Sequence, residues 1–161
     1  MQKIINVAIP LDKCDGEFVS FLPPIYNNII QCGIFTRILY LMHQFTMKGV
    51  NIIIDLKYTH IERYFNKYKC LFNPLDNIDV LNKIQLIENT ILNQPNFKKK
   101  LKTYKISEHM QVGSIKFFSN ISHLNTSADN MRFVLKIAGV WENDAFCGLT
   151  YKFNYVNIMN N

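Results

Sequence analysis

Residues 131–156 read MRFVLKIAGVWENDAFCGLTYKFNYV, and this stretch decides the fold. Two runs rich in Phe, Val, Ile, Trp and Tyr flank a polar turn at residues 142–144, and branched and aromatic side chains of this kind favour β-strands. Successive side chains of a strand point to opposite faces, so Leu149, Tyr151 and Phe153 share one face and polar residues the other. The stretch therefore predicts a β-hairpin with an apolar core face and a basic outer face.

Other patterns precede this hairpin in a definite order. Three strand-like runs come first, at residues 33–45, 50–56 and 58–72. Near 77–93 apolar residues recur at every third or fourth position, which is typical of one amphipathic helix, and a short strand follows at 114–118. A helix between the third and fourth strands favours a mainly β fold, a five-stranded OB-like Greek-key barrel with one helix. The alternative is an α+β open sheet with one packed helix.

The length and composition of the chain indicate one folded domain. It has 161 residues, of which 48% are hydrophobic, and this is enough to bury a core. We expect residues 1–31 to form an N-terminal arm, because Pro23 and Pro24 exclude a helix interior. Residues 33–156 then form the OB-like core of a single domain spanning 1–161. No run approaches the ~18 apolar residues of a membrane span, so no membrane partner is expected.

Cysteine spacing and amino-acid composition indicate the cellular compartment and the source of the protein. The four cysteines are scattered and lack the spacing of a zinc site, which is typical of reduced, buried cysteines of an intracellular protein. Ile, Asn and Lys are abundant and have AT-rich codons, as in an AT-rich virus or mobile element. We therefore expect a viral protein that acts in the cytoplasm or nucleus of its host.

Positive charge is concentrated in two segments. Residues 98–105 carry a net charge of +5 and residues 57–72 a net charge of +3, against +6 for the whole chain. The remainder is slightly acidic, and a segregated basic surface is the electrostatic footprint of a nucleic-acid-binding protein. A solvated lysine-rich connection and a nuclear-import signal are the alternatives for residues 98–105.

Aromatic residues alternate with cations in residues 57–72. Proteins that bind single strands use this mixture, because every base has a π-face for stacking while Lys and Arg follow the phosphates. Tyr58, Tyr64 and Trp141 are the candidate base platforms; the alternative is that these rings belong to the core or its rim. The candidate nucleic-acid-binding residues lie on strand surfaces or in the lysine-rich connection: Arg37, Tyr40, Lys57, Tyr58, Arg63, Tyr64, Lys67, Lys69, Lys98, Lys99, Lys100, Lys102, Lys105, Arg132, Lys136, Trp141 and Lys152.

No catalytic pattern accompanies these residues. The sequence contains no nucleophile elbow, phosphate-binding glycine loop, dinucleotide fingerprint or HExxH zinc motif, and its acidic residues form no pair suited to metal-assisted phosphoryl transfer. We therefore expect a protein that is not an enzyme and has no cofactor or metal.

The closing hairpin resembles a known family. Leu135, Lys136 and Ile137, followed by residues 139–142 and 148–153, resemble the last two strands of OB-fold single-stranded DNA-binding proteins of replicating viruses and related mobile elements. There, "LKI-x-G-[VI]-W-E" precedes a turn and "G-[LI]-T-Y-K-F". The resemblance covers about 25 of the 161 residues.

This resemblance implies cooperative, sequence-independent binding of single-stranded DNA in DNA replication or recombination. Single-stranded DNA is the implied partner, with RNA as the alternative strand and a homo-oligomer as an expected form. The rival interpretation is a viral structural or scaffold β-module whose basic surface faces nucleic acid.

Overall fold

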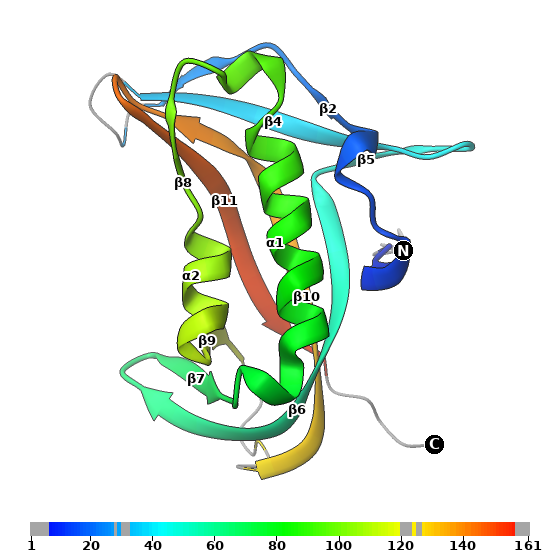
Figure 1. Ribbon diagram of the computed structural model, residues 1–161, viewed down its shortest axis with the longest axis vertical. Coiled ribbons are helices and arrows are strands. Elements are labelled where there is room, and N and C mark those ends of the chain that lie inside the picture. Colours follow the sequence, from blue (N-terminus) through cyan, green and yellow to red (C-terminus); the bar gives the residue numbers. More distant parts are fainter. Residues whose placement is uncertain (1–6, 28, 30–32, 120–123, 125–126, 157–161) are drawn as a thin grey trace, which may run out of the picture.

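The computed structural model describes residues 7–27, 29, 33–119, 124 and 127–156 of the chain (Figure 1). Within these residues the fold is mainly β, with one long helix and one short one. The helices are α1 (Ile78–Leu92) and α2 (Lys105–Val112), and the short 3₁₀ helices are η1 (Leu11–Lys13), η2 (Gly16–Phe18), η3 (Leu75–Asn77) and η4 (Pro95–Phe97). The strands are β1 (Ile9–Pro10), β2 (Val19–Phe21), β3 (Ile25–Asn27), β4 (Gly33–Leu41), β5 (Thr46–Lys48), β6 (Val50–Tyr64), β7 (Lys67–Leu71), β8 (Leu101–Thr103), β9 (Ser114–Phe118), β10 (Ser127–Glu142) and β11 (Phe146–Tyr155).

Five strands of the described chain close into a barrel, in the order β6, β7, β9, β11, β10 and back to β6. All neighbours are antiparallel except β9 and β11, which are parallel. The contact that closes the barrel runs from Ser127↔His60 to Ile137↔Val50. The structure thus confirms the expected five-stranded, OB-like Greek-key barrel. Its interior is filled by apolar side chains that include Ile52, Ile54, Leu56, Ile115, Phe117, Phe133 and Leu135.

Strand β6 is longer than the sequence analysis expected. It runs through the boundary placed at residues 56–57 and ends at Tyr64, because it contains no Gly or Pro that would end it. Tyr58 has a φ of +52°, and after it Thr59 and Ile61 face the core while their neighbours are exposed. The chain reverses at residues 65–66 and returns as β7.

Because β6 is long, helix α1 follows a different strand of the barrel from the one expected. Helix α1 follows the second strand of the closed barrel, whereas the sequence analysis placed it between the third and fourth strands. The run at residues 33–45 supplies β4, which pairs with β10 outside the closed ring, and β4 and β5 form a hairpin that projects at the right of Figure 1. Strand β10 therefore belongs both to the barrel and to this extension.

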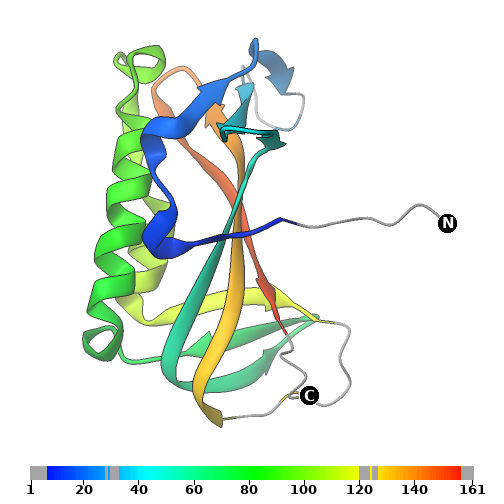
Figure 2. The same ribbon diagram turned by 90° about the vertical axis from the view of Figure 1, so that its right-hand side faces the viewer.

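Helix α1 covers one side of the barrel (Figure 2). Leu81, Ile84, Ile87 and Ile91 recur at three- and four-residue spacing and are buried, which confirms the amphipathic pattern. Asn77, which directly precedes α1, makes no capping bond with its side chain. Its Oδ1 instead accepts from the backbone N–H of Lys57 at 2.8 Å, and its Nδ2 donates to the carbonyl of Lys57 at 3.2 Å. The start of α1 is thereby fixed to β6.

Helix α2 was not expected from the sequence and depends on α1. Glu88 of α1 is buried and accepts from the backbone N–H groups of Ile106 and Ser107, at 3.1 and 2.9 Å, and from the Ser107 hydroxyl. These two N–H groups lie in the first turn of α2, where a helix has no internal acceptors for them. Burial raises the pKa of Glu88, and the hydrogen bonds from Ser107 and Ile106 oppose this rise. A carboxylate from one helix thus caps the other.

Residues of the expected N-terminal arm pack on the rest of the fold. Strand β1 pairs with β6, and β2 and β3 pair with β4. Among the described residues, no helix has the length and apolar character needed to cross a membrane.

Candidate nucleic-acid interface

The outer sides of several strands carry cations and no acids. Strands β4, β5, β7, β9 and β11 contain no Asp or Glu, and their inward neighbours, such as Ile38, Cys70 and Phe117, are buried. Lys136 adds an outward cation from β10. We call the resulting surface the basic face, and its cations are Arg37, Lys48, Lys67, Lys69, Lys116, Lys136 and Lys152.

The strand register places lysines directly opposite one another. Lys69 of β7 faces Lys116 of β9, and Lys136 of β10 faces Lys152 of β11. Like charges in directly opposite positions destabilise a sheet. Lys69 also lies opposite Glu62 of β6, but among the described residues no carboxylate forms an ion pair with any of these four lysines. The repulsion would be relieved by a bound polyanion.

Two lysines of the basic face lie over aromatic rings. The Nζ of Lys67 is 4.8 Å from the centre of the Phe118 ring, and the Nζ of Lys116 is 4.6 Å from that of Tyr64. Phe65 packs edge-on against Tyr64, with ring centres 5.0 Å apart. A cation–π contact positions an ammonium group without neutralising its charge. We call Tyr64, Phe65, Lys67, Lys116 and Phe118 the lysine–aromatic row.

Phe65 is both exposed and strained. It lies in the two-residue turn between β6 and β7, its side chain is 84% exposed, and its φ is +53°. Asn, Asp and Gly are preferred in such turns because they tolerate positive φ, whereas a bulky side chain rarely adopts it. A strained residue of this kind is often found at a functional site.

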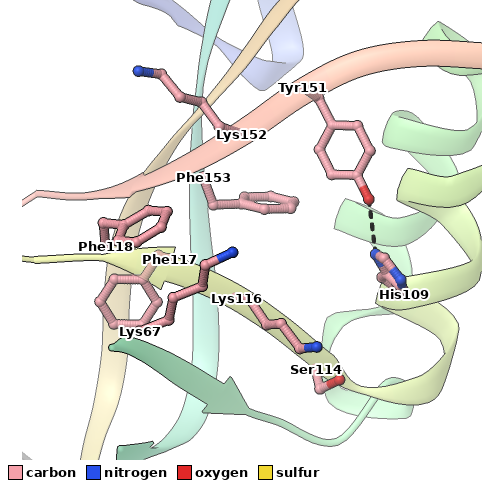
Figure 3. Close-up of a pocket in the computed structure, with 9 residues that line it drawn as sticks. All are labelled: Lys67, His109, Ser114, Lys116, Phe117, Phe118, Tyr151, Lys152 and Phe153. Carbon is pink, nitrogen blue, oxygen red and sulfur yellow. Dashed lines mark hydrogen bonds between the residues drawn. The ribbon is translucent and has the colours of Figure 1, made fainter. Parts of the chain in front are cut away.

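A crevice opens beside the lysine–aromatic row, between β9 and β11 (Figure 3). These strands pair only where Phe117 and Phe118 meet Phe153 and Asn154, and beyond that point they separate toward α2. The crevice has a volume of about 250 Å³, and its lining includes four Phe and Tyr side chains and three lysines. We call it the β9–β11 crevice.

Two polar groups meet at the α2 side of this crevice. Nδ1 of His109 and the hydroxyl of Tyr151 form a hydrogen bond of 2.7 Å. Burial raises the pKa of Tyr151 to about 12, with further contributions from Glu88 and Glu108, so the hydroxyl is neutral at physiological pH. Tyr151 was expected in the core, and it is half-buried there.

A second pocket lies on the other part of the basic face, over β4 and β10. Its volume is also about 250 Å³, and Arg37, Lys48 and Lys136 line it. Three cations around one pocket, with no acid in its lining, suit a phosphate.

The structure places the lysine-rich connection away from the β7 end of this face. Lys98 follows the C-terminal end of α1, whereas β7 precedes its N-terminal end (Figure 1). The helix has 15 residues and is about 22 Å long at ~1.5 Å per residue. Lys98 and Lys99 are exposed there. The two basic segments of the sequence therefore lie at opposite ends of α1.

Two lysines of the lysine-rich connection donate hydrogen bonds to backbone carbonyl groups. The Nζ of Lys100 donates to the carbonyl of Asn143, in the β10–β11 turn, at 2.7 Å. The Nζ of Lys102 donates to the carbonyl of Phe97 at 2.7 Å. Both side chains are half-buried, so their ammonium groups are partly used within the fold.

Tyr40 was expected to contact nucleic acid, and the structure corrects this. Its side chain is only 2% exposed, and its hydroxyl accepts from the backbone N–H of Asp15 at 3.1 Å. Sequence alternation cannot decide which face of a strand is buried when both faces carry apolar residues. In β4, Ile38 and Tyr40 point inward and Arg37 outward.

Several other candidates are committed to internal contacts. Arg132 makes a two-pronged ion pair with Asp55, at 2.7 and 2.8 Å, and Lys105 pairs with Glu108 at 2.7 Å. Trp141 is half-buried and packs so closely on Gly148 that a Cβ there would lie 2.8 Å from its ring. The remaining candidates, which are Lys57, Tyr58 and Arg63, are exposed on β6.

Five cations of the basic face were candidates from the sequence, which are Arg37, Lys67, Lys69, Lys136 and Lys152. Lys116 and Phe118 were not proposed, although the alternation of SIKFF places Ser114, Lys116 and Phe118 on one face. Lys48 and His109 were not proposed either. Phe65 was noted as one ring among many, because its backbone strain is invisible in a sequence.

Within the described ranges, no three His, Cys, Asp or Glu side chains come together in a way that could hold a metal ion. Comparison with known proteins found no matching family model, curated protein sequence or solved structure.

Proposed function

We propose that this protein binds single-stranded DNA without sequence preference, as a non-enzymatic factor of viral or mobile-element replication or recombination. The observation that carries the proposal is the basic face: seven cations on the outer side of the sheet, on strands almost free of acids. The resemblance of the closing hairpin to single-stranded DNA-binding proteins supports the same function. In this proposal the protein leaves the DNA chemically unchanged.

The lysine–aromatic row favours a single strand over a duplex. Phe65 and Phe118 are 84% and 60% exposed, and exposed rings gain by stacking on unpaired bases. A duplex hides the faces of its bases and could contact only the lysines. Binding by stacking and charge also accounts for a lack of sequence preference, because every base has a π-face.

The width of the basic face determines how many nucleotides of a bound strand contact the protein. From β7 to β4 it crosses β9, β11 and β10, which at ~4.8 Å per neighbouring pair gives a path of at least about 19 Å, without the shift along β10 and β11 between its two ends. Such a path holds a few nucleotides, toward the short end of the roughly 4–16 nucleotides that one OB-fold binds.

Titration with oligonucleotides at several salt concentrations tests the proposal. Affinity for oligo(dT) should exceed affinity for a duplex of equal length, and oligo(rU) shows whether the sugar matters. Three to seven contacted phosphates should give a log–log salt slope between about −2 and about −5, at roughly −0.7 per phosphate. Equal affinity for duplex and single strand, or binding that is independent of salt, would contradict the proposal.

The substitution Phe65→Asn should weaken DNA binding while it increases the stability of the fold. Asn tolerates positive φ, so Phe65→Asn should relieve strain and raise the free energy of unfolding by about 1 kcal/mol. Loss of a stacking ring should at the same time weaken oligo(dT) binding about tenfold. Urea denaturation and fluorescence titration measure the two effects.

The matched control for this variant is Phe45→Asn. Phe45 is also an exposed ring, 45% accessible, but it lies at the tip of the β4–β5 hairpin, away from the lysine–aromatic row. Affinity should stay at the wild-type level in this variant. A drop of equal size in both variants would show that Phe65 has no special role.

A further inference from the structure

We infer that the β9–β11 crevice holds one base of the bound strand, with the adjoining phosphates on Lys67 and Lys116. The inference rests on the proposed function, because the base is taken as part of a strand that crosses the basic face. It adds a defined subsite to the proposed function. The base of one nucleotide enters the crevice between β9 and β11, while neighbouring bases stack on exposed rings of the lysine–aromatic row.

The lining of the crevice suits a base better than a phosphate. Phe117 and Phe153 are nearly fully buried and form the inner part, while Phe118 is exposed at the outer part. Lys67, Lys116 and Lys152 also line the crevice, and a phosphate beside them at the surface keeps both its water and a cation. A phosphate moved inward between the rings would lose its hydration. A base gains there, because its flat apolar faces contact aromatic side chains.

The cations lie where the phosphates of an inserted nucleotide would be. Figure 3 shows the amino groups of Lys67 and Lys116 on the β7–β9 side of the crevice, whereas Lys152 extends to the other side of β11. Lys67 and Lys116 are held over Phe118 and Tyr64 and keep their charge. They can therefore bind phosphate on the outer surface without entering the crevice.

The size of the crevice limits the occupant to one base. Its volume of about 250 Å³ corresponds to about eight waters at ~30 Å³ each. It falls below the roughly 300–1,000 Å³ of pockets for drug-sized ligands. A single base fits such a volume, whereas two stacked nucleotides do not.

The His109–Tyr151 pair accounts for the absence of base selection. In their hydrogen bond the donor can be either the hydroxyl of Tyr151 or Nδ1 of His109, since the roles depend on the tautomer of the imidazole. The pair can therefore adapt to the donor or acceptor pattern on the edge of any base. This is consistent with sequence-independent binding by the whole face.

Filling the crevice tests the inference. His109→Trp places a large ring at the α2 side, and Ser114→Phe does so independently from β9, where Ser114 lines the crevice. Each variant should bind oligo(dT) about tenfold more weakly, the effect of losing one stacked base. Neither should change the affinity for an abasic oligomer of the same length, which keeps the phosphates and lacks bases, and the salt slope should also stay constant.

Gln111→Trp is the matched control, because Gln111 is exposed on α2 and does not line the crevice; it should bind both oligomers as the wild type does. Melting temperatures show whether each variant is folded. If folded filling variants bind oligo(dT) within about twofold of the wild type, or lose affinity for the abasic oligomer equally, the inference is wrong although the proposed function stands. If the wild-type protein binds neither oligomer, the proposed function fails, and the inference fails with it.

Discussion

Replacing Lys67 and Lys116 together with Glu should weaken oligo(dT) binding about 100-fold or more. Each lysine would contact a phosphate through a charge-assisted hydrogen bond, worth about 1.5–3 kcal/mol, and the introduced carboxylates would repel the strand. The log–log salt slope should become shallower by about 1.4, the contribution of two phosphates. Fluorescence titration at several salt concentrations measures both quantities.

The same double variant should remain folded. It loses the two cation–π contacts of Lys67 and Lys116, at about 0.5–1 kcal/mol each. Residue 116 lies directly opposite Lys69 in the β7–β9 register, so the new attractive pair returns about 0.2–1 kcal/mol. A 100-fold loss of binding in a variant that denatures within about 2 kcal/mol of the wild type cannot be explained by unfolding.

Lys98→Glu with Lys99→Glu is the control for net charge. It changes the charge of the protein by the same amount at the other end of α1, where both lysines are exposed. Only a small loss of affinity is expected, from the altered long-range field. If this control weakens binding as much as the first variant, net charge decides affinity and the basic face is not the binding site.

Replacing Glu88 with Ala should lower the free energy of unfolding by about 3 kcal/mol or more. The carboxylate is buried and accepts from two backbone N–H groups of α2 and from the Ser107 hydroxyl. Each buried donor left without a partner costs about 1–3 kcal/mol, and the removed side chain leaves a cavity as well. Urea denaturation measures the change.

Glu108→Ala is the comparison for this variant. Glu108 lies on α2 and pairs with Lys105, but both side chains are more than half exposed, and such pairs contribute at most about 1 kcal/mol. If Glu88→Ala is no more destabilising than Glu108→Ala, the cap does not hold α2. Because α2 carries His109, a loss of the cap should also disturb the β9–β11 crevice.

The barrel could be predicted because its strands have simple patterns. Alternation in residues 146–155 identified a strand with one core face, and the structure buries Cys147, Leu149 and Phe153. The three- and four-residue spacing in residues 77–93 likewise identified α1. These patterns follow directly from local geometry, which is why the sequence alone reveals them.

Features that depend on distant contacts could not be predicted. Helix α2 has only eight residues, too few to be stable alone, and it depends on a carboxylate 18 residues earlier in the chain. The pairing of Lys136 with Lys152 is visible only once the hairpin register is known. The lysine-rich connection attracted attention because its charges are adjacent in sequence, whereas the basic face collects single lysines from separate strands.

The sequence indicated which kinds of residue form the candidate site better than it indicated where each of them lies. Cations and rings in residues 57–72 were recognised, and Tyr64, Lys67 and Lys69 do lie together. Tyr40 was misplaced because both faces of β4 carry apolar residues. Phe65 could be identified only from its backbone conformation, which depends on the two-residue turn that joins β6 to β7.

The pairing of β10 with β6 also constrains when the molecule can fold during its synthesis. The paired residues Val50 and Ile137 are separated by 87 positions, and His60 and Ser127 by 67. At about 5–20 residues per second, β6 waits several seconds on the ribosome before its partner emerges. Until then its backbone groups and apolar side chains are unprotected, so nascent chains at high concentration are at risk of pairing with one another. The barrel should therefore close only after β10 has emerged, and expression at lower temperature or with a chaperone should increase the soluble yield.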